Sequence, residues 1–293
     1  MAETMQERGK SASNPLECLE FSNDSVSNRI LLKKALPELI NLDTSISILI
    51  ERVSVEEFHA YKKYVNLILQ ENPADNLSVA GISPNLQEKA RIYHISMMKI
   101  LKYVKNSDKI ELRSETTAED GFEIENCPED DSDLLFYLIM GIFEEHLFGL
   151  YKPYCIQYVI YAIAMTNYNR MSCFLSFLCS LLQGNDQRRT ISALFMASFV
   201  GHIKKPSQDA LEIILEYVRL AKERISTVND KFSRVLLSGL RFINENNPKI
   251  PEISDFLTEF EGINGEPVVF PFDKAPIAAY QAIIDEITDE IME

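Results

Sequence analysis

The segment from Arg188 to Ile203 constrains the fold most, because it predicts a helix that is apolar on nearly every side. It follows a polar break at residues 184–187 and begins with two arginines. A stripe of small residues, Ala193, Ala197 and Gly201, would let a neighbouring helix pack closely. A helix that is covered on all sides belongs either inside a stack of helices or in a membrane.

The membrane alternative fails on length. Residues 151–182 carry few charges, as a hairpin of two short spans would. However, Asn167, Asn169 and Arg170 interrupt this stretch, and Gln157 lies inside its first half. Each uninterrupted apolar piece is shorter than the roughly 20 residues that a membrane span needs. We therefore expect buried core helices and no membrane partner.

Composition narrows the class of protein further. The chain has 293 residues, 46% of them hydrophobic, which is enough for one large domain or two ordinary ones. Its net charge of −15 disfavours direct binding to nucleic acids, because an acidic surface repels phosphates. The five cysteines form no CxxC pair, and the polar N-terminus does not resemble a signal peptide. These features predict a reducing compartment, the cytosol or the nucleus.

Short breakers divide the chain into a series of predicted helices. Residues 1–27 are expected to be a disordered tail, 28–110 N-terminal helical repeats, 111–131 an acidic loop, and 132–293 C-terminal helical repeats. Residues 28–52 are predicted as two helices, broken near Pro37 or near residues 41–43. The other predicted helices are 54–71, 84–105, 132–148, 153–168, 171–182, 188–203, 206–225, 229–246, 253–261 and 276–291. Because almost no segment alternates with period two, we expect an all-α fold, a HEAT-repeat-like solenoid of stacked antiparallel helix pairs.

The motifs of catalysis are missing from the sequence. None of the four histidines forms an HExxH motif or pairs with cysteine at zinc-ligand spacing. Residues 130–133 approach the aspartate-rich motif of helical prenyl transferases, but Leu134 stands where the last aspartate belongs, and a helix cap explains these acids better. Residues 262–267 lack the lysine of a phosphate-binding loop. We therefore expect no enzyme activity, no metal and no cofactor.

Four segments of the chain resemble motifs of a known family and occur in the same order as those motifs. They are IQYVIY at 156–161, CFL at 173–175, RTISALFMASF at 189–199 and FPFD at 270–273. In this order they resemble the VQFFMF, AFL, RQAAGNYIGSF and FPFD motifs of the RNA polymerase I-specific initiation factors of the TIF-IA type. Arg189, Ser198 and Phe199 are identical to the family motif, whereas His202 stands where the family usually has arginine. The region 204–269 is shorter than in the family, so the chain resembles a shortened form.

The resemblance implies a non-catalytic HEAT-repeat protein of the nucleus and nucleolus. It would bind RNA polymerase I through the stalk subunits and bridge the enzyme to the promoter-bound core initiation factor at ribosomal RNA genes. The resemblance also implies that serine phosphorylation regulates this contact and that the free factor can form a homodimer. The alternative is a generic HEAT-type adaptor or scaffold in transport or trafficking.

Candidate functional residues follow from the motifs and from the local pattern. We expect Gln157 to form a structural hydrogen bond between helices rather than an interface, and Ser198 to be a packed small residue. Because positive charge is unfavourable at a helix N-terminus, Arg188 or Arg189 is expected to have an acidic partner. The remaining motif candidates for partner binding are Phe199, His202, Phe270, Pro271, Phe272 and Asp273. The phosphorylation candidates are Ser107, Ser114, Thr116 and Thr117, which flank the acidic loop and are expected to be accessible.

Overall fold

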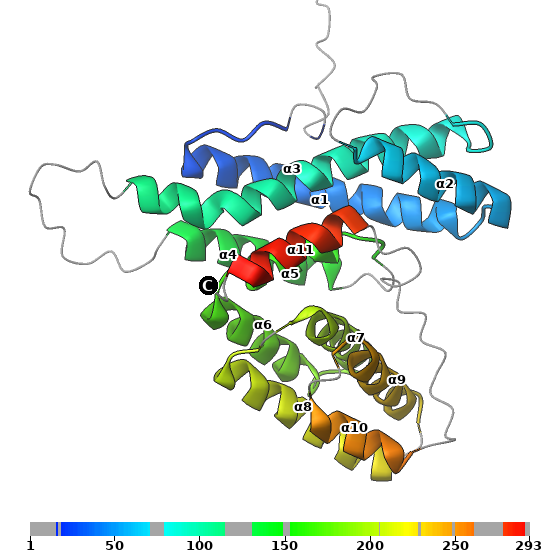
Figure 1. Ribbon diagram of the computed structural model, residues 1–293, viewed down its shortest axis with the longest axis vertical. Helices are drawn as coiled ribbons and strands as arrows, with labels where there is room; N and C mark the ends of the chain where they lie inside the picture. The colour runs from blue at the N-terminus through cyan, green and yellow to red at the C-terminus, as the bar shows by residue number, and fades with distance from the viewer. Residues whose placement is uncertain are drawn as a thin grey trace, which may run out of the picture.

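The computed structural model describes residues 16, 19–70, 79–114, 131–148, 153–204, 206–227, 230–247, 250–260 and 278–290 (Figure 1). Throughout these residues the chain is helical and contains no strand, so the all-α prediction is confirmed. The elements are α1 (Ser25–Ile50), α2 (Val55–Ile68), α3 (Pro84–Ser114), α4 (Asp131–Ile142), the π-helical turn η2 (Phe143–Leu147), α5 (Gln157–Ala164), α6 (Tyr168–Leu181), α7 (Asp186–His202), α8 (Gln208–Thr227), α9 (Lys231–Asn246), α10 (Pro251–Thr258) and α11 (Ala278–Glu290).

The N-terminal half is organised around the long helix α3. This helix packs against α1, α2, α4 and α5, and α1 also contacts α4. Helix α11, the last described element, returns to this half and packs against α3 and α5, as Figure 1 shows. Helix α5 therefore lies between the two halves, with α3 and α11 on one side and α6 on the other.

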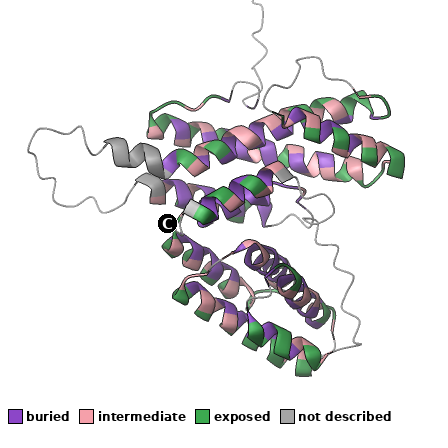
Figure 2. Ribbon diagram, viewed as in Figure 1, coloured by how far each residue is buried: buried purple, intermediate pink, exposed green. Residues whose placement is uncertain are grey.

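Helices α6 to α10 form a regular stack. Helices α6, α8 and α10 pack successively in one row, α7 packs on α9 in a second row, and the pairs α6–α7 and α8–α9 join the rows. Each helix thus contacts its sequence neighbour and the next helix but one, an arrangement consistent with a helical solenoid of antiparallel pairs. Figure 2 shows α7 almost wholly buried, whereas α8 and α10 carry many exposed residues.

The small residues of α7 do admit a neighbouring helix, α9. A Cβ atom added to Gly201 would lie 2.7 Å from Cε1 of Phe242, and one added to Gly239 would lie 3.0 Å from Cβ of Ala197. Every residue from 191 to 200 is buried. This helix is therefore the covered core helix that the sequence predicts. Among the described helices, none is long and apolar enough to cross a membrane.

The predicted break in the first helix is wrong, because α1 continues through Pro37. A proline inside a helix removes one backbone hydrogen bond and crowds the preceding turn. Here the residues around it, Leu36, Leu39 and Ile40, are buried in the core. Burial of this apolar face keeps the helix continuous where local propensity favours a break.

The prediction that residues 1–27 form a disordered tail is wrong for the last part of this segment. Leu19 is fully buried, and its carbonyl oxygen accepts a hydrogen bond of 2.9 Å from Lys99 Nζ. Phe21 stacks on Tyr103 with the ring centroids 4.2 Å apart. Asp24 then caps α1 by accepting hydrogen bonds from the backbone N–H groups of residues 26 and 27. This segment therefore packs along α3 and leads into α1.

Two further boundaries differ from prediction. Helix α3 runs to Ser114, well beyond the predicted end at Lys105, so the first residues of the expected acidic loop are helical. Residues 115–130 lie outside the described residues. Helix α5 begins only at Gln157 instead of Pro153. The N–H groups of residues 154–156, just before it, donate hydrogen bonds to the side chain of Asp43 on α1.

Candidate functional site

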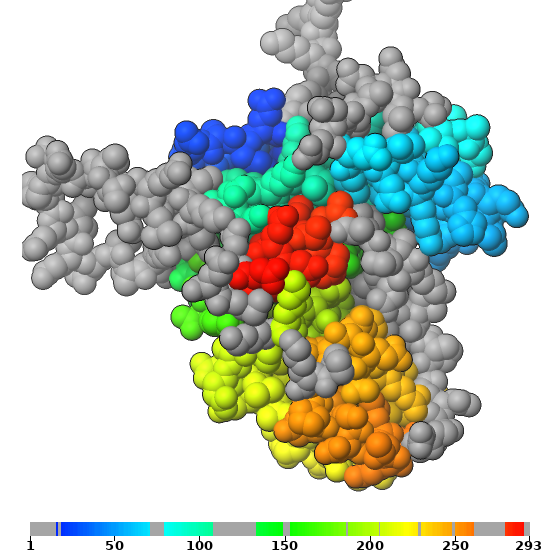
Figure 3. Space-filling view, viewed as in Figure 1, coloured from blue at the N-terminus to red at the C-terminus, as the bar shows by residue number. Residues whose placement is uncertain are grey.

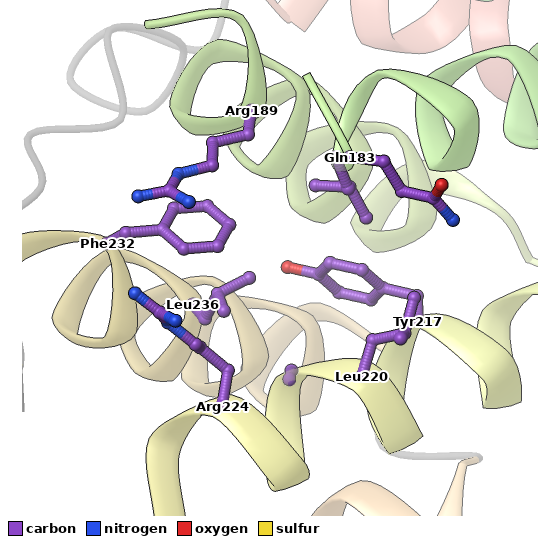
Figure 4. A pocket seen from close by; sticks show the side chains of 9 residues that line it. Gln183, Arg189, Tyr217, Leu220, Arg224, Phe232 and Leu236 are labelled. Carbon is purple, nitrogen blue, oxygen red and sulfur yellow. The ribbon is translucent and has the colours of Figure 1, made fainter. Parts of the chain in front are cut away.

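A pocket lies where the end of α6 and the first turns of α7 and α9 meet the middle of α8 (Figure 4). Its volume is about 220 Å³. Apolar side chains form most of its wall, and two arginines and a tyrosine add polar groups. The lining residues are Leu182, Gln183, Arg189, Tyr217, Leu220, Ala221, Arg224, Phe232 and Leu236.

Two helix caps place the side chains at one side of this pocket. The side chain of Asn185 accepts a hydrogen bond of 3.0 Å from the N–H of Arg188 and begins α7. Asp230 does the same for α9, accepting from the N–H of Ser233 at 2.8 Å. These caps bring Arg189 and Phe232 together on the first turns of adjacent helices. The guanidinium carbon of Arg189 lies 4.7 Å from the centroid of the Phe232 ring, a cation–π contact.

The second arginine of the pocket, Arg224, forms an ion pair with Asp230. Partial burial would raise the pKa of Asp230, but hydrogen bonds from Ser233 and Arg224 outweigh this effect and hold the pKa at about 2. Asp230 is therefore ionised at neutral pH. One carboxylate thus caps α9 and forms an ion pair with Arg224.

Tyr217 contributes a buried hydroxyl. Its side chain is fully buried, and its hydroxyl has no hydrogen-bond partner in the described parts of the chain. Figure 4 shows this hydroxyl pointing into the space that Arg189, Phe232 and Leu236 line. A Cβ atom on Gly239 would lie 3.3 Å from it, so this glycine leaves room for the hydroxyl. Because burial raises the pKa of Tyr217, the hydroxyl stays protonated and can donate to an acceptor.

The structure separates the two arginines that the sequence analysis paired. Arg189 lines the pocket, and the Phe232 ring is one of its contacts there. Arg188, by contrast, is exposed and does not line it. Sequence reasoning missed Tyr217, Arg224 and Phe232, because nothing local marks them. Only the packing of α7, α8 and α9 brings them together.

The other motif residues lie in the core. Gln157 is fully buried, and neither of its amide atoms has a hydrogen-bond partner in the described chain, so the expected interhelical hydrogen bond is absent. Ser198 is packed as expected, fully buried on α7. The ring centroid of Phe199 lies 4.8 Å from that of Phe174 and 5.1 Å from that of Tyr161. These residues build the interior and present no surface to a partner.

His202 lies at the C-terminal end of α7, against α5 and α11. Its ring centroid is 5.6 Å from that of Tyr158. Desolvation lowers the pKa of His202 to about 4, although Asp285 and a hydrogen bond with Gln281 act in the opposite direction. The imidazole is therefore neutral at physiological pH, unlike the arginine that is usual at this place in the family that the chain resembles.

Two of the four phosphorylation candidates, Ser107 and Ser114, lie among the described residues. Ser107 is buried, and its hydroxyl donates a hydrogen bond of 2.7 Å to the carbonyl oxygen of Val104, so the prediction that it is accessible is wrong. The physical reason is the extension of α3, which turns this serine into a core position. Ser114 is the last residue of α3. Thr116, Thr117 and the segment Phe270–Asp273 lie outside the described residues.

A second polar cluster, which the sequence analysis did not predict, is buried between α1, α2, α3 and α11. His94 Nε2 lies 3.1 Å from the hydroxyl oxygen of Tyr61, and His94 Nδ1 lies 2.6 Å from that of Tyr280. Beside it, Asp43 accepts hydrogen bonds from the Tyr93 hydroxyl and from the N–H groups of residues 154–156, at 2.6, 2.9 and 3.2 Å for the three N–H groups in chain order. This cluster ties distant helices together.

Burial determines the charges in this cluster. It raises the pKa of Asp43 to about 6, against the hydrogen bonds from Tyr93 and the backbone, which lower it. It lowers the pKa of His94 to about 3. At neutral pH a carboxylate and a neutral imidazole are thus enclosed side by side. Because both groups are fully covered, the cluster is structural and has no access for a substrate.

The described residues contain no candidate metal site. Across the described residues, no group of three histidine, cysteine or acidic side chains could hold a metal ion. Asp133, from the near-match to the aspartate-rich motif, accepts a hydrogen bond of 2.9 Å from Nε of the buried Arg170. Arg170 also donates to Oγ1 of Thr166 at 2.8 Å. This acid joins α4 to α6.

Comparison of the chain with protein-family models, with curated proteins and with solved structures gives no match in any of the three.

Proposed function

We propose that the chain is an RNA polymerase I-specific initiation factor that works by binding. It would hold the polymerase through its stalk subunits and link it to the promoter-bound core initiation factor, in the nucleolus. The proposal assigns no chemical step to the chain. It rests on the order of the motif segments and on the way in which three of them meet in space.

The meeting of the three segments is the observation that carries the proposal. The segments 156–161, 173–175 and 189–199 lie on α5, α6 and α7. One aromatic residue from each, Tyr161, Phe174 and Phe199, forms a single cluster. The three ring centroids lie 4.8 to 6.3 Å from one another. Residues that resemble one family's motifs therefore pack as one unit, as motifs that define a common scaffold should.

The position of these motifs also indicates where the polymerase would not bind. Most of the matching side chains, among them Ser198 and Phe199, are buried, so they preserve the shape of the helical stack and cannot contact a partner directly. The contact surface must then lie on exposed faces. With a net charge of −15, those faces suit a basic protein surface, and the binding should weaken as salt rises.

A binding experiment tests the proposal. The full chain, immobilised through an affinity tag, is incubated with purified polymerase I stalk subunits, and in parallel with the corresponding subunits of polymerases II and III. An unrelated acidic protein of matched net charge is the control. Enrichment of the polymerase I subunits alone, reduced at high salt, is the expected result. Equal recovery on the control protein would refute the proposal, and recovery of transport cargo with exclusion from the nucleolus would favour the adaptor alternative.

A further inference from the structure

The pocket between α6, α7, α8 and α9 has a buried floor and an open rim. Tyr217 and Ala221 on α8 and Leu236 on α9 line it and are buried, so they form its floor. At the rim, Gln183 is exposed and Phe232 is half-buried. A molecule in solution can therefore enter between the ends of α6 and α9 and reach the floor.

The size and lining of the pocket fit a molecule with one ring. An apolar protein cavity of about 150 Å³ is large enough to bind benzene, whereas sites for larger small molecules begin at roughly 300 Å³. This pocket, at about 220 Å³, has room for one ring and a substituent of a few atoms. Its apolar lining residues are Leu182, Leu220, Ala221, Phe232 and Leu236. The ring of Phe232 favours an aromatic ligand, because aromatic rings attract one another beyond their burial.

The hydroxyl of Tyr217 is a second, independent sign of a ligand. It is a buried donor without an acceptor in the described chain, and it points into the pocket (Figure 4). Buried polar groups almost always have a hydrogen-bond partner. An oxygen on the ligand would supply the missing acceptor. A carbonyl oxygen suits this role better than a hydroxyl, because it accepts without carrying a donor that would itself need a partner.

The charges at the pocket favour a neutral ligand over an acid. The guanidinium of Arg224 forms an ion pair with Asp230. Arg189 is engaged as well, in part by the Phe232 ring. A carboxylate that left water for the apolar floor would lose its hydration and meet only cations that already have partners. The net charge of −15 on the whole protein also repels anions.

We infer that this pocket binds a small neutral aromatic carbonyl compound, whose ring packs against Phe232 and Leu236 and whose oxygen accepts a hydrogen bond from the Tyr217 hydroxyl. The inference is independent of the proposed binding to the polymerase, since it concerns a small molecule and a different experiment. It gives the chain a ligand-binding site in the middle of the stack of helices α6 to α9.

Titrations of the full chain with simple compounds, followed by ligand-observed NMR, test the inference. Acetophenone, an aromatic ketone, is the probe. Acetone lacks the ring, benzoate carries a negative charge, and α-methylstyrene has a methylene group in place of the carbonyl oxygen. Acetophenone should bind saturably with a Kd below about 1 mM, and at least about tenfold more tightly than acetone or benzoate.

A variant without the hydroxyl tests the hydrogen bond. Tyr217→Phe should weaken the binding of acetophenone about three- to tenfold and leave that of α-methylstyrene unchanged. The infrared carbonyl stretch of bound acetophenone should lie at lower wavenumber in the wild type than in this variant, because a hydrogen bond weakens the C=O bond. Since the hydroxyl has no partner in the described chain, the variant should melt at no lower temperature than the wild type.

Two further variants locate the site. Ala221→Leu places extra side-chain volume in the floor and should abolish the binding of both aromatic compounds. Tyr137→Phe is the matched control for Tyr217→Phe, because Tyr137 is exposed on α4, away from the pocket, and it should leave all affinities unchanged. Circular dichroism melting shows whether each variant is folded.

Several results would overturn the inference. Absence of saturable binding by acetophenone would do so without any variant. An equal loss of acetophenone and α-methylstyrene in Tyr217→Phe, or no loss of either, would remove the hydrogen bond. Tighter binding of benzoate than of acetophenone would show that the ligand is an anion. Tighter binding of N-acetylphenylalanine amide would show that the pocket receives a side chain of a partner protein instead.

Discussion

The Nδ1 atom of His94 lies 2.6 Å from the hydroxyl oxygen of Tyr280, although 186 residues separate the two in the chain. Both side chains are fully buried. Through this contact α11 is anchored to α3, and the ion pair of Lys105 with Glu286 joins the same two helices at their exposed edge. The contact makes α11 part of the N-terminal half in space.

Removal of the Tyr280 hydroxyl should destabilise the protein. The variant Tyr280→Phe leaves Nδ1 of His94 buried without its partner, which costs about 1–3 kcal/mol of unfolding free energy. Urea unfolding followed by circular dichroism measures the loss. Tyr137→Phe is the matched control, because Tyr137 is 59% exposed, and it should change the free energy by less than about 0.5 kcal/mol. Equal stability of both variants would contradict the assigned contact.

Asp43 and His94 should oppose each other in the dependence of stability on pH. The pKa of His94 falls from 6.5 to about 3 on folding, so the unfolded chain binds the extra proton and stability falls as pH drops through this window. The pKa of Asp43 rises from 3.8 to about 6, so the folded chain binds the extra proton and stability falls as pH rises from 3.8 to 6. Between about pH 4 and 6 the two effects should largely cancel.

Two variants separate these effects. The stability of the wild type relative to Asp43→Asn should increase as pH falls from 6 to 4, whereas its stability relative to His94→Asn should decrease over the same range. Each slope should approach 1.4 kcal/mol per pH unit, the value for one proton. Denaturant titrations at intervals of half a pH unit provide the measurement. Slopes of the same sign would show that the two charges are assigned wrongly.

The close approach of α7 and α9 should tolerate no side chain at Gly201. In Gly201→Ala the new Cβ atom would lie 2.7 Å from the buried ring of Phe242, and the shift that follows should cost about 1–3 kcal/mol. Gly141→Ala, on α4, is the control, since a Cβ atom there meets nothing within 4 Å in the described chain. That substitution should stabilise the protein by about 0.5–1 kcal/mol. Thermal melting measures the stability of both variants. A Gly201→Ala variant as stable as the wild type would exclude the tight contact.

The pair of Asp133 and Arg170 should be structural. Asp133→Asn weakens the partner of a guanidinium that is only 4% exposed, but Asp133 itself is about half exposed, so water limits the loss to about 1–2 kcal/mol. A double-mutant cycle with Arg170→Met measures the coupling of the two side chains. A coupling near zero would show that the pair contributes nothing. Magnesium-dependent turnover that Asp130→Ala and Asp131→Ala abolish would instead indicate a helical metal-dependent transferase, whose aspartate-rich motif residues 130–133 approach.

The spacing of residues along the sequence predicts α7, because the pattern that marks this helix lies within the helix itself. The spacing of Ala193, Ala197 and Gly201 lies within three turns of one helix, and α9 uses that stripe as expected. Pro37 and the segment around Leu19 gave misleading local signals, because contacts with α3 and the rest of the core decide their structure. Such contacts come from residues far away in the chain.

The two polar sites show the same limit. Arg189 could be singled out from its charge at a helix N-terminus, but its companions Tyr217, Arg224 and Phe232 lie 28 to 43 residues further along the chain. The partners of Asp43 lie 50 to 113 residues away. No pattern within one helix relates residues at these distances. The pocket and the buried cluster therefore required the tertiary structure.

The return of α11 to α3 also sets an order of events during synthesis. A ribosome adds about 5–20 residues per second, so Tyr280 is joined to the chain roughly 10 to 40 s after His94. During this interval the nascent N-terminal helices lack the hydroxyl that covers the imidazole. The surface of α3 and α5 that later receives α11 is then open to chaperones, and a chain that stops early would expose it permanently.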